Sequence, residues 1–281
     1  MAKRELYPEK DGAVLKFLYR TAMGRTILKV LTAPVVSTIG GKFMDSPLSK
    51  KLIPSFIEKN HIPMEEYLEE EYTCFNDCFT RRIKPEARPI NQNPRAFIAG
   101  CDGLLSAYRI QDDLVIPVKR SEYSISELLD FDERAEEFRD GTCLVFRLCV
   151  NHYHRYAYFD DGVKGKNTFV SGILHTVRPI ALKQSKVFVE NSREYTFLET
   201  EHFGTVAQIE VGAMLVGKIK NHHETHTFRR GEEKGMFLYG GSTIIMLVKK
   251  DAARFSKQIF EATEQGREIP VKMGERIGVK I

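Results

Sequence analysis

The sequence lacks several features that define particular classes of protein. It has no periodic repeat, which excludes collagen-like chains and solenoids. None of its five cysteines is spaced as Cys-x-x-Cys, and we expect no cleavable signal sequence ahead of them, so a reducing compartment is favoured. What is present is a chain of 281 residues that is 42% hydrophobic and 28% charged. Such a chain is long enough for one large domain or two small ones with a sizeable core.

Positive charge is concentrated at the N-terminal end. Residues 1–60 hold eleven Lys or Arg and five Asp or Glu, a net charge of +6, whereas the other 221 residues carry 31 and 33, a net charge of −2. A cationic first segment beside a nearly neutral body favours attraction to an anionic surface, although a solvated helical face would show the same charges. The sequence contains no recognised nucleic-acid-binding motif, so we expect no nucleic-acid partner.

Residues 13–33 are apolar but carry four cations, which a membrane-spanning helix rarely does. At about 100° per residue, Lys16 and Arg20 share one face and Arg25 and Lys29 share another. The apolar face therefore changes direction at Gly24, and we predict two short amphipathic helices with a break there. Such helices could lie in the membrane interface or could cover the protein's own core.

Beyond residue 95 the sequence consists of short runs of β-branched and aromatic residues separated by Gly and Asp. This pattern predicts strands. The predicted fold class is therefore α+β, with a helical N-terminal segment over residues 1–70 followed by a β-rich body over residues 71–281. The expected strands cover residues 114–118, 143–150, 206–211, 214–219 and 243–248, and the expected helices in the body cover residues 124–138 and 252–264.

Two clusters could supply acid–base chemistry. Asp102 stands before Gly103 in a predicted tight turn, where an aspartate is usually only a turn residue. His152 and His154 directly follow a predicted buried strand, where titratable rings are well placed for proton transfer. Surface histidines also collect at strand ends, so neither cluster alone establishes a catalytic role.

A third cluster, residues 222–226, holds three histidines and one glutamate. His222 and His226 would share a face if the segment were helical, as metal ligands on a helix do, but the glutamate is not placed as in a zinc-protease helix. No Cys pair or Asp–His pair lies nearby. We therefore interpret the segment as a solvent-exposed loop and expect no metal site.

A fourth cluster, Gly240, Gly241 and Ser242, introduces an apolar predicted strand. Two glycines permit backbone conformations closed to other residues. If the Gly241 carbonyl were strained, the Ser242 hydroxyl could attack it and convert the peptide bond to an ester. Loss of the Ser242 α-proton would then break the ester and leave dehydroalanine, which hydrolyses to a pyruvoyl group. A plain hairpin turn would have the same spacing.

Taken in order, these clusters and several other short segments resemble the phosphatidylserine decarboxylase family in its bacterial, membrane-associated form. The similarity runs from about residue 13 to residue 250. The segments that carry it are residues 75–90, 99–103, 123–129, 153–155, 191–193, 211–213, 216–217, 230–235 and 241–243.

The resemblance implies a proenzyme that cleaves itself between Gly241 and Ser242, giving a β chain of residues 1–241 and an α chain of residues 242–281. Ser242 would become a covalent pyruvoyl group, which takes up the substrate amine and serves as the electron sink when CO₂ leaves. The implied reaction is decarboxylation of phosphatidylserine to phosphatidylethanolamine, and no diffusible cofactor is needed.

The resemblance also implies roles for individual residues. Family members use an Asp–His–Ser triad for self-cleavage, and Asp102 and Ser242 match two of its members. The family's Tyr-His-Arg-x-His motif is incomplete here, because His154 matches its first histidine whereas Ala157 stands at the position of the second, the usual base. His154 could serve both as this base and later as the acid that protonates the α-carbon. His175 or His152 could instead supply the base, or self-cleavage could be slow or absent.

A phosphatidylserine substrate keeps its acyl chains in the bilayer. The resemblance therefore implies a peripheral enzyme on the cytoplasmic face of the cell membrane, docked on anionic lipid by its cationic N-terminal segment. It also implies a homodimer. Two other functions are compatible with the residues: a pyruvoyl-dependent decarboxylase of a soluble amino acid, and an uncut, non-catalytic lipid-binding relative.

Overall fold

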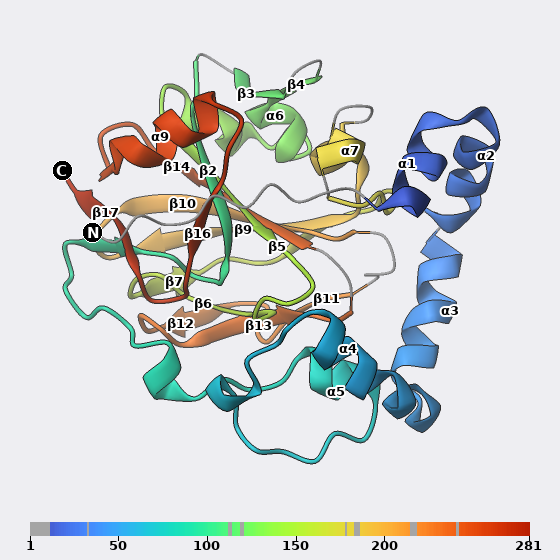
Figure 1. The fold of residues 1–281 in the computed structure, drawn as a ribbon. Coiled ribbons are helices and arrows are strands. Elements are labelled where there is room, and N and C mark those ends of the chain that lie inside the picture. The colour runs from blue at the N-terminus through green and yellow to red at the C-terminus, as the bar shows by residue number, and fades with distance from the viewer. Residues whose placement is uncertain are drawn as a thin grey trace.

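The computed structural model describes residues 12–32, 34–111, 114–118, 121–177, 179–182, 186–213, 218–239 and 242–281. Helices dominate the first part of the chain and strands dominate the rest (Figure 1), which confirms the α+β class. The α-helices are α1 (Ala13–Arg20), α2 (Ala22–Leu31), α3 (Pro34–Met44), α4 (Ile53–Lys59), α5 (Phe75–Phe79), α6 (Ile125–Leu128), α7 (Pro179–Leu182), α8 (Val187–Glu190) and α9 (Lys257–Glu264). The 3₁₀ helices are η1 (Pro47–Leu52), η2 (Met64–Glu66), η3 (Pro85–Ala87) and η4 (Glu133–Phe138).

The strands form a large central sheet and smaller sheets around it. In chain order they are β1 (Ala96–Ile98), β2 (Gly103–Arg109), β3 (Leu114–Val118), β4 (Ser121–Ser124), β5 (Thr142–Leu148), β6 (Arg155–Ala157), β7 (Gly162–Lys164), β8 (Thr168–Val170), β9 (Arg193–Thr200), β10 (Gly204–Val211), β11 (Ile219–Asn221), β12 (His226–Phe228), β13 (Glu233–Phe237), β14 (Ser242–Val248), β15 (Ala253–Phe255), β16 (Ile269–Val271) and β17 (Arg276–Lys280).

The central sheet has the order β12-β7-β9-β10-β14-β5-β2-β16, with β8 also paired to β9, and its pairings are antiparallel. Strand β14 lies in its middle and is buried along its whole length. Its side chains alternate between two apolar clusters, with Ile244 and Met246 in one and Ile245 and Leu247 in the other. Burial on both faces explains why the sequence shows an uninterrupted apolar run here.

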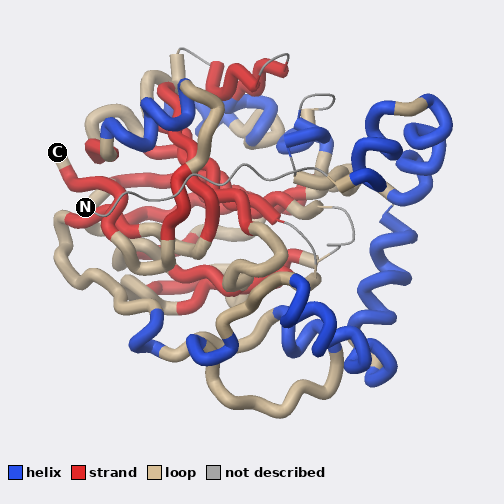
Figure 2. Tube along the Cα trace, in the orientation of Figure 1, coloured by secondary structure: helices blue, strands red, loops and turns tan. Residues whose placement is uncertain are grey.

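Two different layers cover the faces of this sheet. The cluster that holds Ile244 also contains Tyr156 and Phe237, which come from the small sheet β11-β13-β6. The cluster that holds Ile245 contains side chains from α6, η4 and α8. The small sheet and helix α6 lie on opposite sides of the central strands (Figures 1 and 2). Any side chain of β14 therefore belongs to one layer or the other according to its position in the alternation.

The first two helices meet at Thr21 rather than at Gly24, so the predicted position of the break is wrong. Thr21 is the N-cap of α2, and its hydroxyl oxygen accepts a hydrogen bond from the Gly24 N–H at 2.9 Å. Gly24 lies inside α2, where an added Cβ would stand only 2.1 Å from the Phe17 carbonyl oxygen. Gly24 is therefore needed because two helices approach closely, not because a helix ends there.

Four of the predicted strands correspond to β3, β5, β10 and β14. Residues 214–217 of the fifth lie outside the described residues, and β11 begins at Ile219. The helix predicted over residues 124–138 is interrupted, because Asp130 and Phe131 have positive φ angles of 53° and 62°. The helix predicted over residues 252–264 is wrong in its first part, which pairs with β17 as strand β15 before α9 begins.

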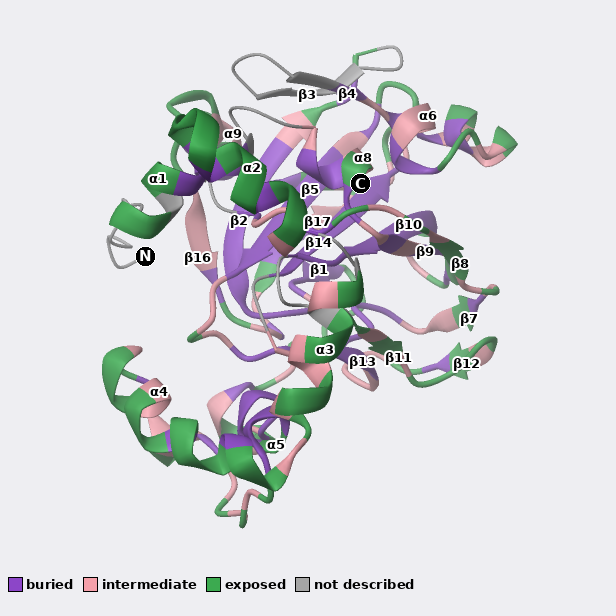
Figure 3. Cartoon of the chain, turned by 90° about the vertical axis from the view of Figure 1, so that its right-hand side faces the viewer, coloured by how far each residue is buried: buried purple, intermediate pink, exposed green. Residues whose placement is uncertain are grey.

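The N-terminal helices expose apolar side chains. Ten of the fifteen large hydrophobic side chains that are exposed among the described residues lie between positions 14 and 52: Val14, Phe17, Met23, Ile27, Val30, Val35, Ile39, Phe43, Leu48 and Leu52. Figure 3 shows α1, α2 and α3 coloured largely as exposed. Within the described part of the chain, no helix combines the length and the apolarity needed to cross a bilayer.

Candidate active site

Three strand ends lie side by side at one end of the central sheet. Ser242 at the start of β14 is opposite Leu148 at the end of β5, and Leu104 of β2 is opposite Arg147. Gly103 therefore flanks Leu148 on the side away from Ser242, about 10 Å from Ser242 at the usual strand spacing of about 4.8 Å. The topology thus brings Ser242, the residue before Gly103 and the segment after β5 to the same end of the sheet.

Ser242 is fully buried, and its Oγ has no hydrogen-bond partner within the described part of the chain. Because side chains alternate along a strand, Ser242 shares the face of Ile244 and Met246, which is the face covered by β6 and β13. A buried hydroxyl that makes no hydrogen bond costs about 1–3 kcal/mol. Each such group calls for an explanation, and a catalytic role is one. Gly241, on the other side of the predicted cleavage site, lies outside the described residues.

His154 is also fully buried and lies just before β6, in the layer that Ser242 faces. Its Nδ1–H donates to the His152 carbonyl oxygen at 2.9 Å, which leaves Nε2 as the unprotonated nitrogen of a neutral ring. Nε2 is buried without a hydrogen-bond partner among the described residues. Burial, reinforced by the charges of Arg81 and His152, lowers the pKa of His154 well below its usual value. The imidazole is therefore neutral at physiological pH and is suited to accept a proton.

Aromatic rings link His154 to the segment that leads into Ser242. The His154 ring lies 4.0 Å from the ring of Phe79, centroid to centroid, and Phe79 meets Tyr239 edge-on at 5.4 Å. The Tyr239 N–H donates to the Asn76 side-chain oxygen at 3.0 Å. The His154 carbonyl oxygen accepts from the Phe237 N–H at 3.0 Å. His154 is thus held against the end of β13, a few residues before Ser242.

Asp102 is buried and forms a two-point ion pair with Arg88. The Arg88 Nε and Nη2 groups donate to its two carboxylate oxygens at 2.8 and 2.6 Å, and the Met273 N–H donates to Oδ1 at 2.9 Å. Arg88 also binds Glu66 at 2.8 Å. Burial alone would lower the pKa of Arg88, but its hydrogen bonds and charge interactions with Asp102 and Glu66 raise it overall. No hydrogen bond among the described residues joins any two of Asp102, His154 and Ser242.

Ala157, at the position of the missing second histidine, lies against the turn that carries Asp102. Its N–H donates to the Gly100 carbonyl oxygen at 2.7 Å. A cavity of about 420 Å³ borders this position, and its lining includes Ala157, Arg88, Tyr153 and Met273. Space therefore exists next to the ion-pair partner of Asp102, where a larger side chain at position 157 would stand.

The two alternative histidines are held in other ways. His175 lies 3.1 Å through Nδ1 from the Tyr19 hydroxyl and 3.9 Å through Nε2 from the Glu190 carboxylate. The Asn191 side-chain amide donates hydrogen bonds to the carbonyl oxygens of His175 and Gly212. Gly212 follows Val211, which pairs with Thr243 of β14. The Nδ1 of His152 accepts from the Cys149 N–H at 3.1 Å. Both rings thus have at least one nitrogen engaged by a neighbour.

Sequence reasoning missed the residues that position these groups. Arg88 holds Asp102, and Phe79 and Arg81 support the loop of His154, because the Arg81 guanidinium donates to the carbonyl oxygens of Asn151 and His152 at 3.3 and 3.4 Å. All three lie in residues 75–90, a segment whose resemblance to the family was recognised without a role. The signal was a set of arginines and aromatics in an otherwise irregular segment.

Known proteins resemble this chain over nearly its whole length. The family model described as phosphatidylserine decarboxylase matches residues 75–279. The phosphatidylserine decarboxylase proenzyme 2 of Clostridium acetobutylicum is 44% identical over 278 residues, which cover 98% of this chain and 95% of the relative. The phosphatidylserine decarboxylase proenzyme of Clostridium perfringens is 39% identical, with 99% and 98% covered. A Clostridium botulinum proenzyme is 37% identical, with 98% and 96% covered.

These matches make the chain an enzyme of the carboxy-lyase class. It belongs to the phosphatidylserine decarboxylase family.

Proposed function

We propose that the protein decarboxylates phosphatidylserine to phosphatidylethanolamine and CO₂, using a pyruvoyl group that it makes from Ser242 by cutting the Gly241–Ser242 bond. The observation that carries the proposal is the fully buried Ser242 hydroxyl without a partner among the described residues, at the sheet end where His154 and Asp102 also lie. The names of the relatives supply the substrate.

Self-cleavage requires a base next to Ser242. In the proposed sequence, Nε2 of His154 takes the hydroxyl proton as the Ser242 oxygen bonds to the Gly241 carbonyl carbon and the amide C–N bond breaks, which gives an ester and a free amine. Removal of the Ser242 α-proton then breaks the ester C–O bond, leaving Gly241 as a carboxylate and residue 242 as dehydroalanine. Addition of water releases ammonia and leaves the pyruvoyl group.

The residues present fit this group. Ser242 begins a strand that is paired on both sides, so the group formed from it would be held rigidly inside the protein. When formed, the pyruvoyl carbonyl supplies an electron-accepting centre for loss of CO₂. His154 would hold a proton at Nε2 and return it to the substrate α-carbon. The Arg88–Asp102 pair would fix the turn beside β2, and the buried setting would exclude water from the reacting atoms.

The N-terminal helices support docking on an anionic membrane. Helix α2 buries Leu28 but exposes Met23, Ile27 and Val30, which leaves these three apolar side chains accessible to lipid. Exposed cations accompany the exposed apolar side chains along this region: Lys16, Arg20, Arg25, Lys29, Lys42, Lys50 and Lys51. Cations near an anionic leaflet contribute about 1 kcal/mol each to binding. We propose peripheral attachment at the cytoplasmic face of the cell membrane, with a homodimer of processed chains as the assembly.

Intact mass of the denatured, freshly purified protein tests self-cleavage. We expect two fragments separated after Gly241, the C-terminal one blocked and carrying the mass of a pyruvoyl group at position 242. Ser242→Ala should stay as one chain. Thr243→Val is the matched control, because Thr243 is the next residue of β14 and its Oγ1 is also buried without a partner among the described residues. An uncut wild-type chain would overturn the pyruvoyl mechanism and favour a non-catalytic relative.

The substrate is tested separately with the processed protein. We expect phosphatidylethanolamine to form from phosphatidylserine in mixed micelles and no product from free serine or other soluble amino acids. Activity confined to a soluble amino acid would retain the pyruvoyl chemistry but replace the lipid substrate.

A further inference from the structure

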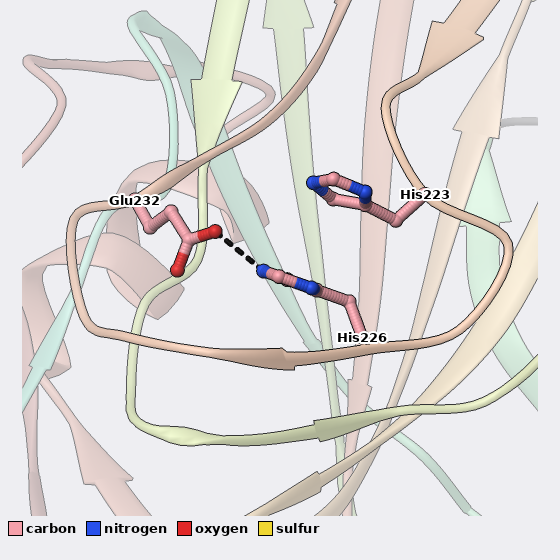
Figure 4. Close-up of side chains that lie close together, drawn as sticks. All are labelled: His223, His226 and Glu232. Atoms are coloured by element: carbon pink, nitrogen blue, oxygen red, sulfur yellow. Dashed lines mark hydrogen bonds and ion pairs between the residues drawn. The ribbon is translucent and has the colours of Figure 1, made fainter.

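Two histidines and a glutamate lie close together where β12, at the edge of the central sheet, connects to β13 of the small sheet, and none of them is among the catalytic groups proposed above. His223 lies in the loop between β11 and β12, His226 begins β12, and Glu232 directly precedes β13 (Figure 4). Each offers one ligand atom, and these atoms all lie within 4.8 Å of one another. We propose that His223, His226 and Glu232 bind one divalent transition-metal ion, with Zn²⁺ as the ion that fits best.

The carboxylate is already fixed in the orientation that a ligand needs. The Glu232 Oε2 accepts from the Arg229 N–H at 2.9 Å, and Oε1 accepts from the His226 Nε2–H at 2.6 Å. The proton shared between His226 and Glu232 occupies the place where a metal ion would join them.

The second imidazole lies directly beside the first. The rings of His223 and His226 are stacked, with centroids 4.0 Å apart and an interplanar angle of 20°. In a tetrahedral zinc site the Zn–N distance is about 2.0–2.1 Å, which places ligand atoms about 3.3 Å apart. Closing a separation of up to 4.8 Å to that value requires ligand-atom shifts of up to about 1.5 Å. The three side chains are exposed or half-buried, so they can rotate to make these shifts.

The donor set favours a borderline transition metal over a hard cation. Two imidazoles and one carboxylate are typical of Zn²⁺ sites that keep a water molecule in the fourth position. Ca²⁺ and Mg²⁺ prefer sites made of oxygen ligands, and only Glu232 among the three proposed ligands supplies oxygen. The proposed site should therefore bind Zn²⁺ in preference to Ca²⁺ and Mg²⁺ because of its nitrogen ligands.

From the sequence, metal binding was considered only for a helical segment, and residues 222–226 were interpreted as a solvent-exposed loop. Residues 222–225 do form an exposed loop, His226 begins strand β12, and His222 turns away to contact Glu233 at 2.6 Å. The third ligand, Glu232, is six residues beyond His226 and reaches it because β12 and β13 are joined by a short turn. Since β12 to β13 is the segment that leads toward Ser242, a bound ion would brace it without touching the catalytic groups.

The test uses the full-length chain without a histidine tag, freed of metal by chelation. We expect titration calorimetry with Zn²⁺ alone to give one equivalent bound, and Zn²⁺ to raise the midpoint of thermal unfolding because it binds the folded state. His223→Ala/His226→Ala should lose both effects. Glu232→Gln, which keeps the shape of the side chain, should weaken binding by about tenfold or more. His222→Ala is the matched control and should bind as the wild type does.

Co²⁺ absorption distinguishes this site from one built on thiols. We expect visible bands of a site with nitrogen and oxygen ligands that vanish in the double variant. Absence of stoichiometric Zn²⁺ binding, binding that survives in the double variant, or a thiolate charge-transfer band would each overturn the proposal. None of these readouts depends on decarboxylase activity. The metal site can therefore be disproved while the proposed function holds, and the proposed function can be disproved while the metal site holds.

Discussion

The ring of His154 packs on the ring of Phe79, with centroids 4.0 Å apart, although 75 positions separate the two residues in the sequence. The contact encloses the imidazole, and the hydrogen bond from Nδ1 to the His152 carbonyl oxygen selects the tautomer with a free Nε2. The imidazole is held in one orientation and uncharged, as the proposed base requires. Residues 75–90 therefore contribute to the placement of the proposed base through Phe79.

Replacing His154 tests this base directly. We expect His154→Gln to leave the chain largely uncut, with the cleavage rate lowered about 10²–10⁴-fold, the usual contribution of a positioned general base. The measurement is intact mass over time after synthesis. His61→Asn is the control, because His61 follows α4 and has a positive φ of 49°, which asparagine tolerates. A His154→Gln protein that is processed and active at the wild-type rate would remove His154 from the mechanism.

Stability should fall with acidification because of His154. Burial lowers the pKa of this group in the folded state, whereas the unfolded chain binds a proton near the usual value of 6.5. Below that pH the unfolded state binds more protons, so this contribution to stability is fully present above pH about 6.5 and is lost as the pH falls further, by roughly 1 kcal/mol per pH unit. Urea unfolding at several pH values, measured on the uncut Ser242→Ala chain so that both proteins are single chains, should show a smaller acid loss when His154→Gln is added. Equal losses in both proteins would contradict the buried, neutral imidazole.

Removal of Arg88 should destabilise the protein strongly. Arg88→Leu leaves the buried Asp102 carboxylate without its ion-pair partner, and breaking a buried pair in this way costs about 3–5 kcal/mol. Arg82→Leu serves as the comparison, since the Arg82–Glu70 pair is exposed and should contribute far less. The readout is the free energy of unfolding from urea titration of the uncut Ser242→Ala chain, with and without each substitution. Similar losses for the two variants would mean that the buried Arg88–Asp102 pair stabilises the protein no more than the exposed Arg82–Glu70 pair does.

Membrane attachment should depend on the exposed apolar side chains of α1 and α2. Phe17→Asp with Ile27→Asp should release the protein from vesicles that contain phosphatidylserine, measured by flotation, without disturbing buried Leu18 and Leu28. Deletion of residues 1–33 should also release it, but the deletion removes the Tyr19 contact with His175 as well, so the substitutions are the cleaner test.

Phe131→Asp is the matched control for these substitutions, because Phe131 is 75% exposed and belongs to the turn between α6 and η4. It should bind vesicles as the wild type does. Vesicle binding that is unchanged by the α1 and α2 substitutions would mean that another surface of the protein binds the membrane.

The sequence predicted the features that depend on local patterns of residues and missed those that depend on contacts between distant parts of the chain. Strand β14 was predictable because burial on both faces leaves a continuous apolar run. The break between α1 and α2 was misplaced because glycine signals both helix ends and close contacts, and only the packing decides which. The Arg88–Asp102 pair and the His226–Glu232 contact were missed because they join turns whose relative placement depends on the whole sheet.

The central position of β14 determines how a chain cut before Ser242 would behave. The segment that begins at Ser242 supplies β14, which is paired with both β10 and β5, and also β16 and β17, which pair with β2 and β1. A chain cut before Ser242 would stay in one piece for as long as the sheet persists. Once denatured, its two fragments would have to find each other by diffusion, so refolding would become a second-order reaction and slow with dilution. The uncut chain would then be the form that folds efficiently, and heat damage to a cut chain would not be readily reversed.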